Sequence, residues 1–123
     1  MGLDMYLTGE RRLPRDHSNT RRLIGELYDL GYWRKHPNLH GYIVQEFADG
    51  IDDCRSIDLD ESAIQQILTA IQEEQLPHTI GFFFGESDGT EKEHDLAIFS
   101  DALAWLAETD EQAWRFVVYR ASW

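Results

Sequence analysis

Hydrophobic and polar residues alternate at the start of the chain. Leu3, Met5 and Leu7 occupy every second position within residues 2–8, and less hydrophobic side chains lie between them. A period of two residues is typical of a strand that buries one face. The pattern therefore predicts a half-buried strand over residues 2–8.

The next two segments are less regular. Residues 11–22 carry five arginines and contain Pro14, and we expect a loop or turn there. Residues 23–35 are ambiguous, because their first apolar positions have helical spacing whereas the later aromatic positions and Gly31 suit a strand. We favour a strand that ends near Trp33.

Two segments in the middle of the chain have the spacing of amphipathic helices. The first is expected to begin at Pro37, which suits the first helical position, and to stop near Gly50. The second is expected to begin after Asp60, whose side chain can cap the helix, and to end before Pro77. The short segment 56–59 that precedes it is a candidate strand.

The last third of the chain contains two strand signals and one helix signal. Residues 82–84 are three consecutive phenylalanines within Thr79–Gly85, which predict a strand buried on both faces. Thr90 and Glu93 match a capping box, so a third helix is expected to follow them. Residues 115–122, which include valines and a tyrosine, predict a closing strand.

Strands at both ends of the chain with helices between them predict an α+β fold. We expect a small, mostly antiparallel sheet with about three helices packed on one face. A chain of 123 residues has the size of one domain, so residues 1–123 are predicted to form a single α+β domain.

Charge is unevenly distributed along the chain, whose formal net charge is −12. Residues 1–22 hold five basic and three acidic residues, a net of +2, whereas the remaining six basic and 20 acidic residues give −14. Such an acidic body repels nucleic acid, so we expect no direct binding of nucleic acid. An acidic surface of this kind could instead bind in a basic groove on a protein partner.

The cysteine content and the hydropathy indicate a cytoplasmic protein. Cys54 is the one cysteine, so the chain can form no internal disulfide, as is usual in a reducing compartment. No apolar stretch approaches the roughly 20 residues that a membrane span requires, and the first residues lack a secretory signal pattern. We expect no membrane association and no cofactor.

The segment Gly31–His40 is the strongest candidate for a ligand site. Backbone N–H groups at the start of a helix attract anions, and Arg34 and Lys35 beside them could hold a phosphate or carboxylate. Trp33 could then stack on a ring of the ligand, and His40 could act as an acid or base. The candidate ligand-binding residues are Trp33, Arg34, Lys35, His40, Cys54 and Trp123.

Blander interpretations compete with this one. The segment Gly31–His40 also fits a charged loop in which Trp33 fills the core. This is the commoner case, because ligand pockets are few per protein. His36, His40 and Cys54 could together bind zinc, although Pro37 keeps His36 out of helical geometry. Cys54 could be a nucleophile, but its acidic neighbours oppose thiolate formation. We therefore assign no metal ligand and no catalytic residue.

Several short pieces of the sequence, taken in order, match the pattern of a known group of proteins. They are Met1–Leu7, Gly31–Lys35, His40, Asp52–Cys54, Gly81–Gly85, Tyr119, Ser122 and Trp123. With these pieces in this order, the chain resembles a family of small uncharacterised proteins of phages, prophages and bacterial genomes. The resemblance implies a phage-related accessory protein and implies no particular reaction.

These observations lead to two functional hypotheses. The first is a non-enzymatic, acidic protein-binding module of the phage or prophage accessory type, with a partner of unknown identity. The alternative is a protein or enzyme that binds a small molecule or phosphate through Trp33, Arg34, Lys35 and His40. Exposed aromatic residues could also pair two copies into a homodimer.

Overall fold

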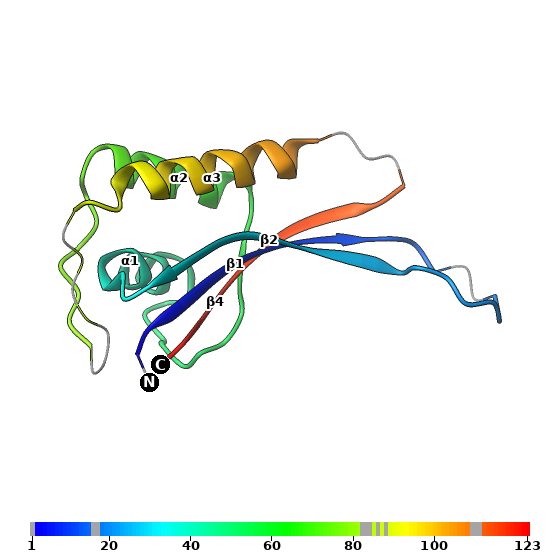
Figure 1. Cartoon of the computed structure of the whole chain (residues 1–123), viewed down its shortest axis with the longest axis horizontal. Coiled ribbons are helices and arrows are strands. Elements are labelled where there is room, and N and C mark those ends of the chain that lie inside the picture. The colour runs from blue at the N-terminus through cyan, green and yellow to red at the C-terminus, as the bar shows by residue number, and fades with distance from the viewer. Residues whose placement is uncertain (1, 16–17, 82–84, 86, 88, 109–111) are drawn as a thin grey trace.

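A computed structural model describes residues 2–15, 18–81, 85, 87, 89–108 and 112–123 of the chain. In this part of the chain, four strands form one sheet in which all neighbours are antiparallel (Figure 1). In sheet order the strands are β2 (Gly25–Arg34), β1 (Asp4–Arg12), β4 (Trp114–Ser122) and β3 (Ile57–Leu59).

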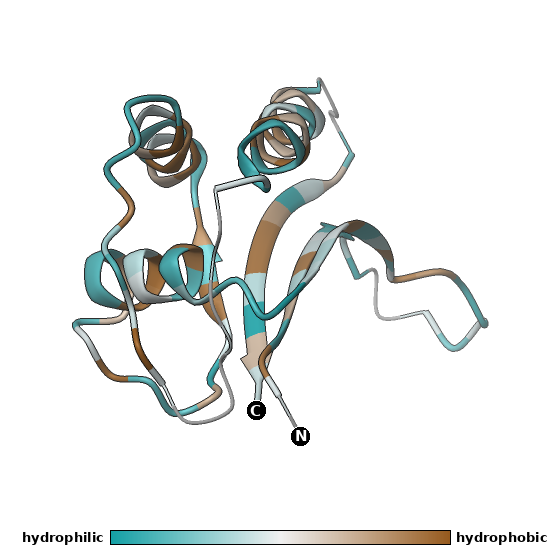
Figure 2. Ribbon diagram, turned by 60° about the vertical axis from the view of Figure 1, so that its left-hand side comes forward, coloured by the Kyte–Doolittle hydropathy of each residue, from teal (hydrophilic) through white to brown (hydrophobic). Residues whose placement is uncertain are grey.

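The helices lie together on one face of this sheet, as the two ribbon views show (Figures 1 and 2). The predicted α+β fold, with an antiparallel sheet and helices on one face, is therefore confirmed. The described helices are α1 (Pro37–Phe47), α2 (Glu61–Gln72) and α3 (Lys92–Ala107).

The alternation at the start of the chain produces the buried face of β1. Leu3, Met5 and Leu7 are completely buried, whereas Tyr6 between them is exposed on the other face. The strand continues to Arg12, so the prediction that residues 11–22 form a loop is wrong for its first two residues. The reason is that β1 is a central strand, and residues 11 and 12 pair with both β2 and β4.

The ambiguous segment forms a strand, as we favoured. β2 is an edge strand that pairs with β1 along its length, with a bulge between Leu7 and Thr8. Its Gly31 allows α3 to pack closely, because a Cβ at this position would lie 2.6 Å from Cγ2 of Ile98. Pairing with β1 therefore outweighs the helical spacing of its first residues.

The predicted starts of the first two helices are confirmed. Pro37 opens α1, and the helix ends at Phe47 shortly before Gly50. Asp60 caps α2, because its Oδ1 atom accepts a hydrogen bond from the backbone N–H of Ala63 at 2.8 Å. The candidate strand before α2 is also confirmed, since Ile57–Leu59 pairs with β4.

The capping box predicted for α3 is wrong. The N-cap residue is Glu91 rather than Thr90, and its side chain makes no cap hydrogen bond within the helix. The Oε2 atom of Glu91 instead accepts from the backbone N–H of Gly89 at 3.0 Å. The carboxylate thus stabilises the turn that leads into α3.

The strand predicted over Thr79–Gly85 is not formed by the residues that can be examined. Residues 79–81 and 85 lie outside any strand, and Ile80 is 85% exposed. Residues 82–84 lie outside the described residues. The backbone N–H of Thr79 donates to Oδ1 of Asn38 at 3.0 Å, which ties this segment to α1 instead of to the sheet.

The core lies between the sheet and the helices. Trp33 of β2 stacks on Phe99 of α3 with ring centroids 5.5 Å apart, and both rings are buried. The apolar residues of α2 and the buried residues of β1 and β4 complete one continuous cluster. Polar side chains buried at the edge of this cluster form the candidate site.

Candidate functional site

The structure does not bring the candidate residues of the Gly31–His40 segment to one place. Trp33 points toward the helices and is 4% exposed, whereas Arg34 follows it in the strand and is exposed. Successive side chains of a strand point to opposite faces, so these two residues lie on opposite sides of the sheet. Lys35 is also exposed, with φ +55° and with its side chain beside Gly85.

Three other candidates do lie near one another. His40 is 2% exposed, and its ring contacts that of Trp123 with centroids 5.7 Å apart. Cys54 is free and exposed, and it lines a small cavity together with His40, Asp52 and others. This cavity has a volume of about 10 Å³, which is roughly the space of one water molecule. It is therefore too small for an organic ligand.

The imidazole of His40 is fully occupied by hydrogen bonds. Its Nδ1 atom lies 2.6 Å from the hydroxyl of Tyr119, and its Nε2 atom lies 2.9 Å from Oδ1 of Asp52. Burial raises the pKa of Tyr119 well above its ordinary value, and the charge of Asp52 adds to this effect. Tyr119 is therefore a neutral phenol. With a neutral His40 imidazole whose Nε2–H donates to Asp52, the hydroxyl of Tyr119 donates to Nδ1.

A second histidine, His36, lies in a buried polar network at the N-cap of α1. His36 is 3% exposed and Asp95 of α3 is 1% exposed. Nε2 of His36 lies 2.7 Å from Oδ2 of Asp95, and the indole N–H of Trp33 donates to Oδ1 of the same carboxylate at 2.7 Å. Asp95 thus links β2, the start of α1 and α3.

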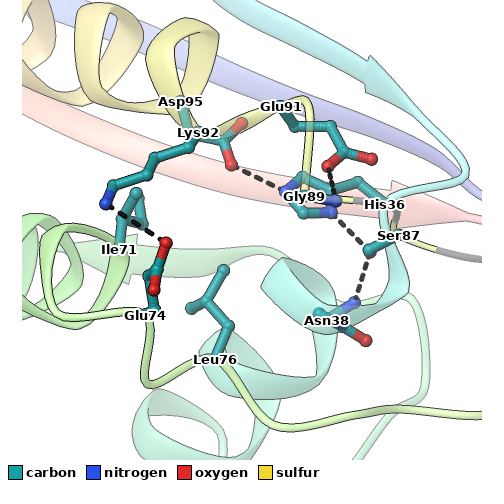
Figure 3. Close-up of a pocket in the computed structure, with 10 residues that line it drawn as sticks. All are labelled: His36, Asn38, Ile71, Glu74, Leu76, Ser87, Gly89, Glu91, Lys92 and Asp95. Carbon is teal, nitrogen blue, oxygen red and sulfur yellow. Dashed lines mark hydrogen bonds and ion pairs between the residues drawn. The ribbon is translucent and has the colours of Figure 1, made fainter.

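The network extends from His36 to a serine. Nδ1 of His36 lies 2.7 Å from Oγ of Ser87, which is half-buried. The backbone N–H of Asn38 donates to the same oxygen at 3.2 Å, as Figure 3 shows. Ser87, His36 and Asp95 therefore form one continuous chain of hydrogen bonds.

This chain borders a cavity of about 210 Å³ between α1, the end of α2 and the start of α3 (Figure 3). Ile71 and Leu76 supply apolar lining, and Lys92 forms an ion pair with Glu74 at 3.5 Å on its wall. His36, Asn38, Ser87 and Asp95 also line it. The cavity is thus small, partly apolar and bordered by a hydroxyl group.

Sequence reasoning missed most of this network. His36 was considered only as a zinc ligand, and neither Ser87 nor Asp95 was a candidate. The sequence did contain one indication that Asp95 is buried. Asp95 precedes Phe99 by four residues and Ala102 by seven, so it lies on the buried stripe of α3. A carboxylate on an apolar helix face requires a buried partner.

The residues considered as zinc ligands are not arranged around one point. The two ring nitrogens of His36 contact Ser87 and Asp95, and those of His40 contact Tyr119 and Asp52. Among the residues that the structure describes, no group of three or more histidine, cysteine or acidic side chains could hold a metal ion.

Charge is segregated in the fold. Residues 37–108, which include all three described helices, hold two basic and 16 acidic residues, a net of −14. The rest of the chain holds nine basic and seven acidic residues, a net of +2. The exposed carboxylates in and next to the helices are Glu46, Asp49, Asp60, Glu61, Glu73, Glu74, Glu93, Asp101 and Glu108.

The opposite face of the sheet carries a different surface. Tyr6 and Tyr32 are 44% and 45% exposed and lie beside each other, with ring centroids 5.3 Å apart. Phe116 is also exposed, and the guanidinium of Arg12 lies 5.7 Å from the centroid of its ring. This face is aromatic and carries arginines, in contrast to the acidic helices.

None of the helices in the described part of the chain has both the length and the apolar character that a membrane crossing demands. Comparison of the chain with protein-family models, with curated protein sequences and with solved structures found no match.

Proposed function

We propose that this protein is an acidic accessory protein of the phage or prophage type that binds a basic surface on a partner protein. The observation that carries the proposal is the net charge of −14 on residues 37–108, the part of the chain that forms the three helices. The resemblance in short sequence pieces supports the accessory role.

The contacts of these carboxylates favour such a role. Arg55 and Lys92 are the two basic residues of the segment, and they pair with Asp53 and Glu74. These two cations cannot balance the nine exposed carboxylates in and next to the helices, so the helical side has a negative potential. A basic partner surface is attracted by this potential and gains speed and specificity of association from it.

The same charge argues against nucleic acid as a direct partner, because phosphates are repelled. We place the interaction in the cytoplasm, where a free and exposed thiol such as that of Cys54 stays reduced. The exposed aromatic residues on the other face of the sheet offer a separate surface on which two copies could pair.

The alternative ligand site receives less support from the geometry. A phosphate clamp of Trp33, Arg34, Lys35 and His40 requires their side chains to converge. Trp33 is buried under the helices, Arg34 points to the other face of the sheet, and His40 is saturated by Tyr119 and Asp52.

Two charge-reversal variants test the proposal. Glu73→Lys/Asp101→Lys alters the helical side, and Asp29→Lys/Asp58→Lys alters exposed residues of β2 and β3. Each replacement adds two charges, so both variants change the net charge from −12 to −8. The wild-type protein and both variants are used to capture proteins from a bacterial lysate at low and high salt.

The proposal predicts a partner that the wild type and the β2/β3 variant recover at low salt, that the helix variant loses, and that 1 M salt releases. Equal loss of the partner in both variants would show that net charge rather than the helical surface is responsible. Recovery of no salt-sensitive partner by the wild type would contradict the proposal.

A further inference from the structure

We infer that Ser87, His36 and Asp95 form a nucleophilic site that accepts the acyl group of a small carboxylic ester. The inference is independent of the proposed binding function, because it rests on the cavity between the helices and not on their outer carboxylates. Its basis is the pair of 2.7 Å contacts of the His36 ring, one to a hydroxyl and one to a buried carboxylate.

For a neutral His36 imidazole, the partners of its two ring nitrogens assign the tautomer. The indole N–H of Trp33 can only donate, so Oδ1 of Asp95 is an acceptor. The carboxylate atom Oδ2 of Asp95 then accepts a hydrogen bond from Nε2–H, and Nδ1 carries the lone pair. The hydroxyl of Ser87 therefore donates to Nδ1, and the backbone N–H of Asn38 donates to Oγ.

This is the arrangement that activates a serine hydroxyl. A serine is a weak nucleophile until a neighbouring base removes its proton, and the base must itself be oriented by a third group. His36 supplies the base through Nδ1, and Asp95 holds the ring through Nε2. Either ring nitrogen of a histidine can be the base, and here the hydrogen bond from Nε2–H to Asp95 assigns that role to Nδ1.

The surroundings hold this geometry in place. The carboxylate of Asp95 is also bound by Trp33, whose ring stacks on Phe99, so it cannot swing away from the histidine. His36 and Asp95 are almost completely buried, and electrostatic interactions are stronger there than in water. Ser87 is half-buried and lines the cavity, so the proposal puts the acyl group in that cavity, next to Oγ.

The cavity defines the class of substrate. A volume of about 210 Å³ lies below the 300–1,000 Å³ range that is usual for drug-sized ligands, so the site suits a short acyl group. Ile71 and Leu76 provide apolar contacts for its carbon atoms. A carboxylic ester with a short acyl chain fits both the size and the lining.

The chemical steps balance within these groups. Oγ of Ser87 attacks the carbonyl carbon and forms an O–C bond while its proton passes to Nδ1 of His36. The bond to the leaving oxygen then breaks, and that oxygen takes the proton from Nδ1 and departs as an alcohol. Water repeats the sequence on the acylated Ser87, which releases the carboxylic acid and restores the free hydroxyl.

The test uses the full chain with p-nitrophenyl acetate and with a fluorophosphonate. The fluorophosphonate forms an Oγ–P bond as the P–F bond breaks, and fluoride and the serine proton leave. We expect mass spectrometry to place the adduct on Ser87, and p-nitrophenyl acetate to give a burst of p-nitrophenol. Ser87→Ala should abolish both signals, whereas Ser100→Ala, at an exposed serine of α3, should leave them unchanged.

A variant of Asp95 tests whether this residue orients the His36 ring for the reaction or only stabilises the fold. Asp95 contacts the base His36 and the indole of Trp33 but not the nucleophile, so Asp95→Asn should lower kcat by about 100-fold or more and leave KM unchanged. A purely structural role for Asp95 would change the melting temperature without this split. Absence of an adduct on Ser87 in the folded wild type, or equal labelling of Ser87→Ala, would overturn the inference.

Discussion

His36 and His40 lie one helical turn apart at the start of α1, and their rings are bound in the same way. Each Nδ1 atom contacts a hydroxyl, at 2.7 Å in His36 and 2.6 Å in His40, and each Nε2 atom contacts a carboxylate. The hydroxyl partners are Ser87 and Tyr119, which are 51 and 79 residues away along the chain. The two histidines thus connect α1 to distant parts of the fold.

The first prediction concerns the hydroxyl of Tyr119. Tyr119→Phe removes the donor to His40 Nδ1 and leaves this buried nitrogen without its partner. We expect the free energy of unfolding to fall by about 1–3 kcal/mol, measured by urea denaturation. Tyr6→Phe is the matched control, because Tyr6 is 44% exposed, and a change within about 0.5 kcal/mol is expected. Equal effects of the two variants would refute the role of this hydrogen bond.

The second prediction is a pH dependence that comes from the same tyrosine. The pKa of Tyr119 is raised by burial and by the charge of Asp52, so the unfolded chain releases this proton at a lower pH than the folded protein does. The stabilisation is complete below the unfolded pKa of about 10 and is lost as pH rises through the folded value. Urea denaturation from pH 8 to 11 should show this loss in the wild type.

Other tyrosines also affect the alkaline range, because hydrogen bonds to carboxylates raise the pKa of Tyr28 and Tyr32. The comparison with Tyr119→Phe separates their contribution. The variant should lose less stability than the wild type between pH 10 and 11. Parallel pH profiles for the two proteins would contradict the assignment to Tyr119.

The third prediction concerns the buried carboxylate of α3. Asp95→Ala removes the acceptor of both Trp33 Nε1–H and His36 Nε2–H, and it also leaves a small void. We expect a loss of about 3 kcal/mol or more in urea denaturation, because buried polar groups without partners are costly. Asp101→Ala, at an exposed position of the same helix, should change stability by no more than about 0.5 kcal/mol. A loss as small as that of the control would exclude a structural role for Asp95.

The fourth prediction tests the close approach of α3 to β2. A Cβ at Gly31 would lie 2.6 Å from Cγ2 of Ile98, so Gly31→Ala should destabilise the protein by about 1–3 kcal/mol. Ile98→Ala removes the clashing methyl group. The double variant should therefore lose less than the sum of the two single losses in thermal or urea denaturation. Strict additivity would mean that the two residues do not collide.

Local signals were sufficient for most of the secondary structure. The alternation of Leu3, Met5 and Leu7 predicted β1, and Pro37 and Asp60 marked the starts of α1 and α2. The capping box at Thr90 failed because several polar residues near the start of α3 compete to bind the turn, and sequence spacing does not decide between them. Of the strand expected over Thr79–Gly85, the described residues 79–81 and 85 lie outside the sheet, and the side chain of Asn38 in α1 binds the backbone of Thr79.

Part of the candidate site could also have been placed from the sequence. Trp33 and Arg34 are neighbours in a strand, and strand geometry alone sends them to opposite faces. This consequence of our own strand prediction already argued against a shared ligand pocket. The position of Asp95 on the apolar stripe of α3 likewise indicated a buried carboxylate, but not its partners.

By itself, the sequence determined most of the elements, the excess of acidic residues and the absence of an internal disulfide, because these depend on residue type and on short-range periodicity. Only the tertiary structure decided that His36 meets Ser87 and Asp95, which are 51 and 59 residues away, while His40 meets Tyr119. Such meetings depend on strand register and on how helices pack on the sheet. Those contacts are set by the whole chain at once, and no local pattern encodes them.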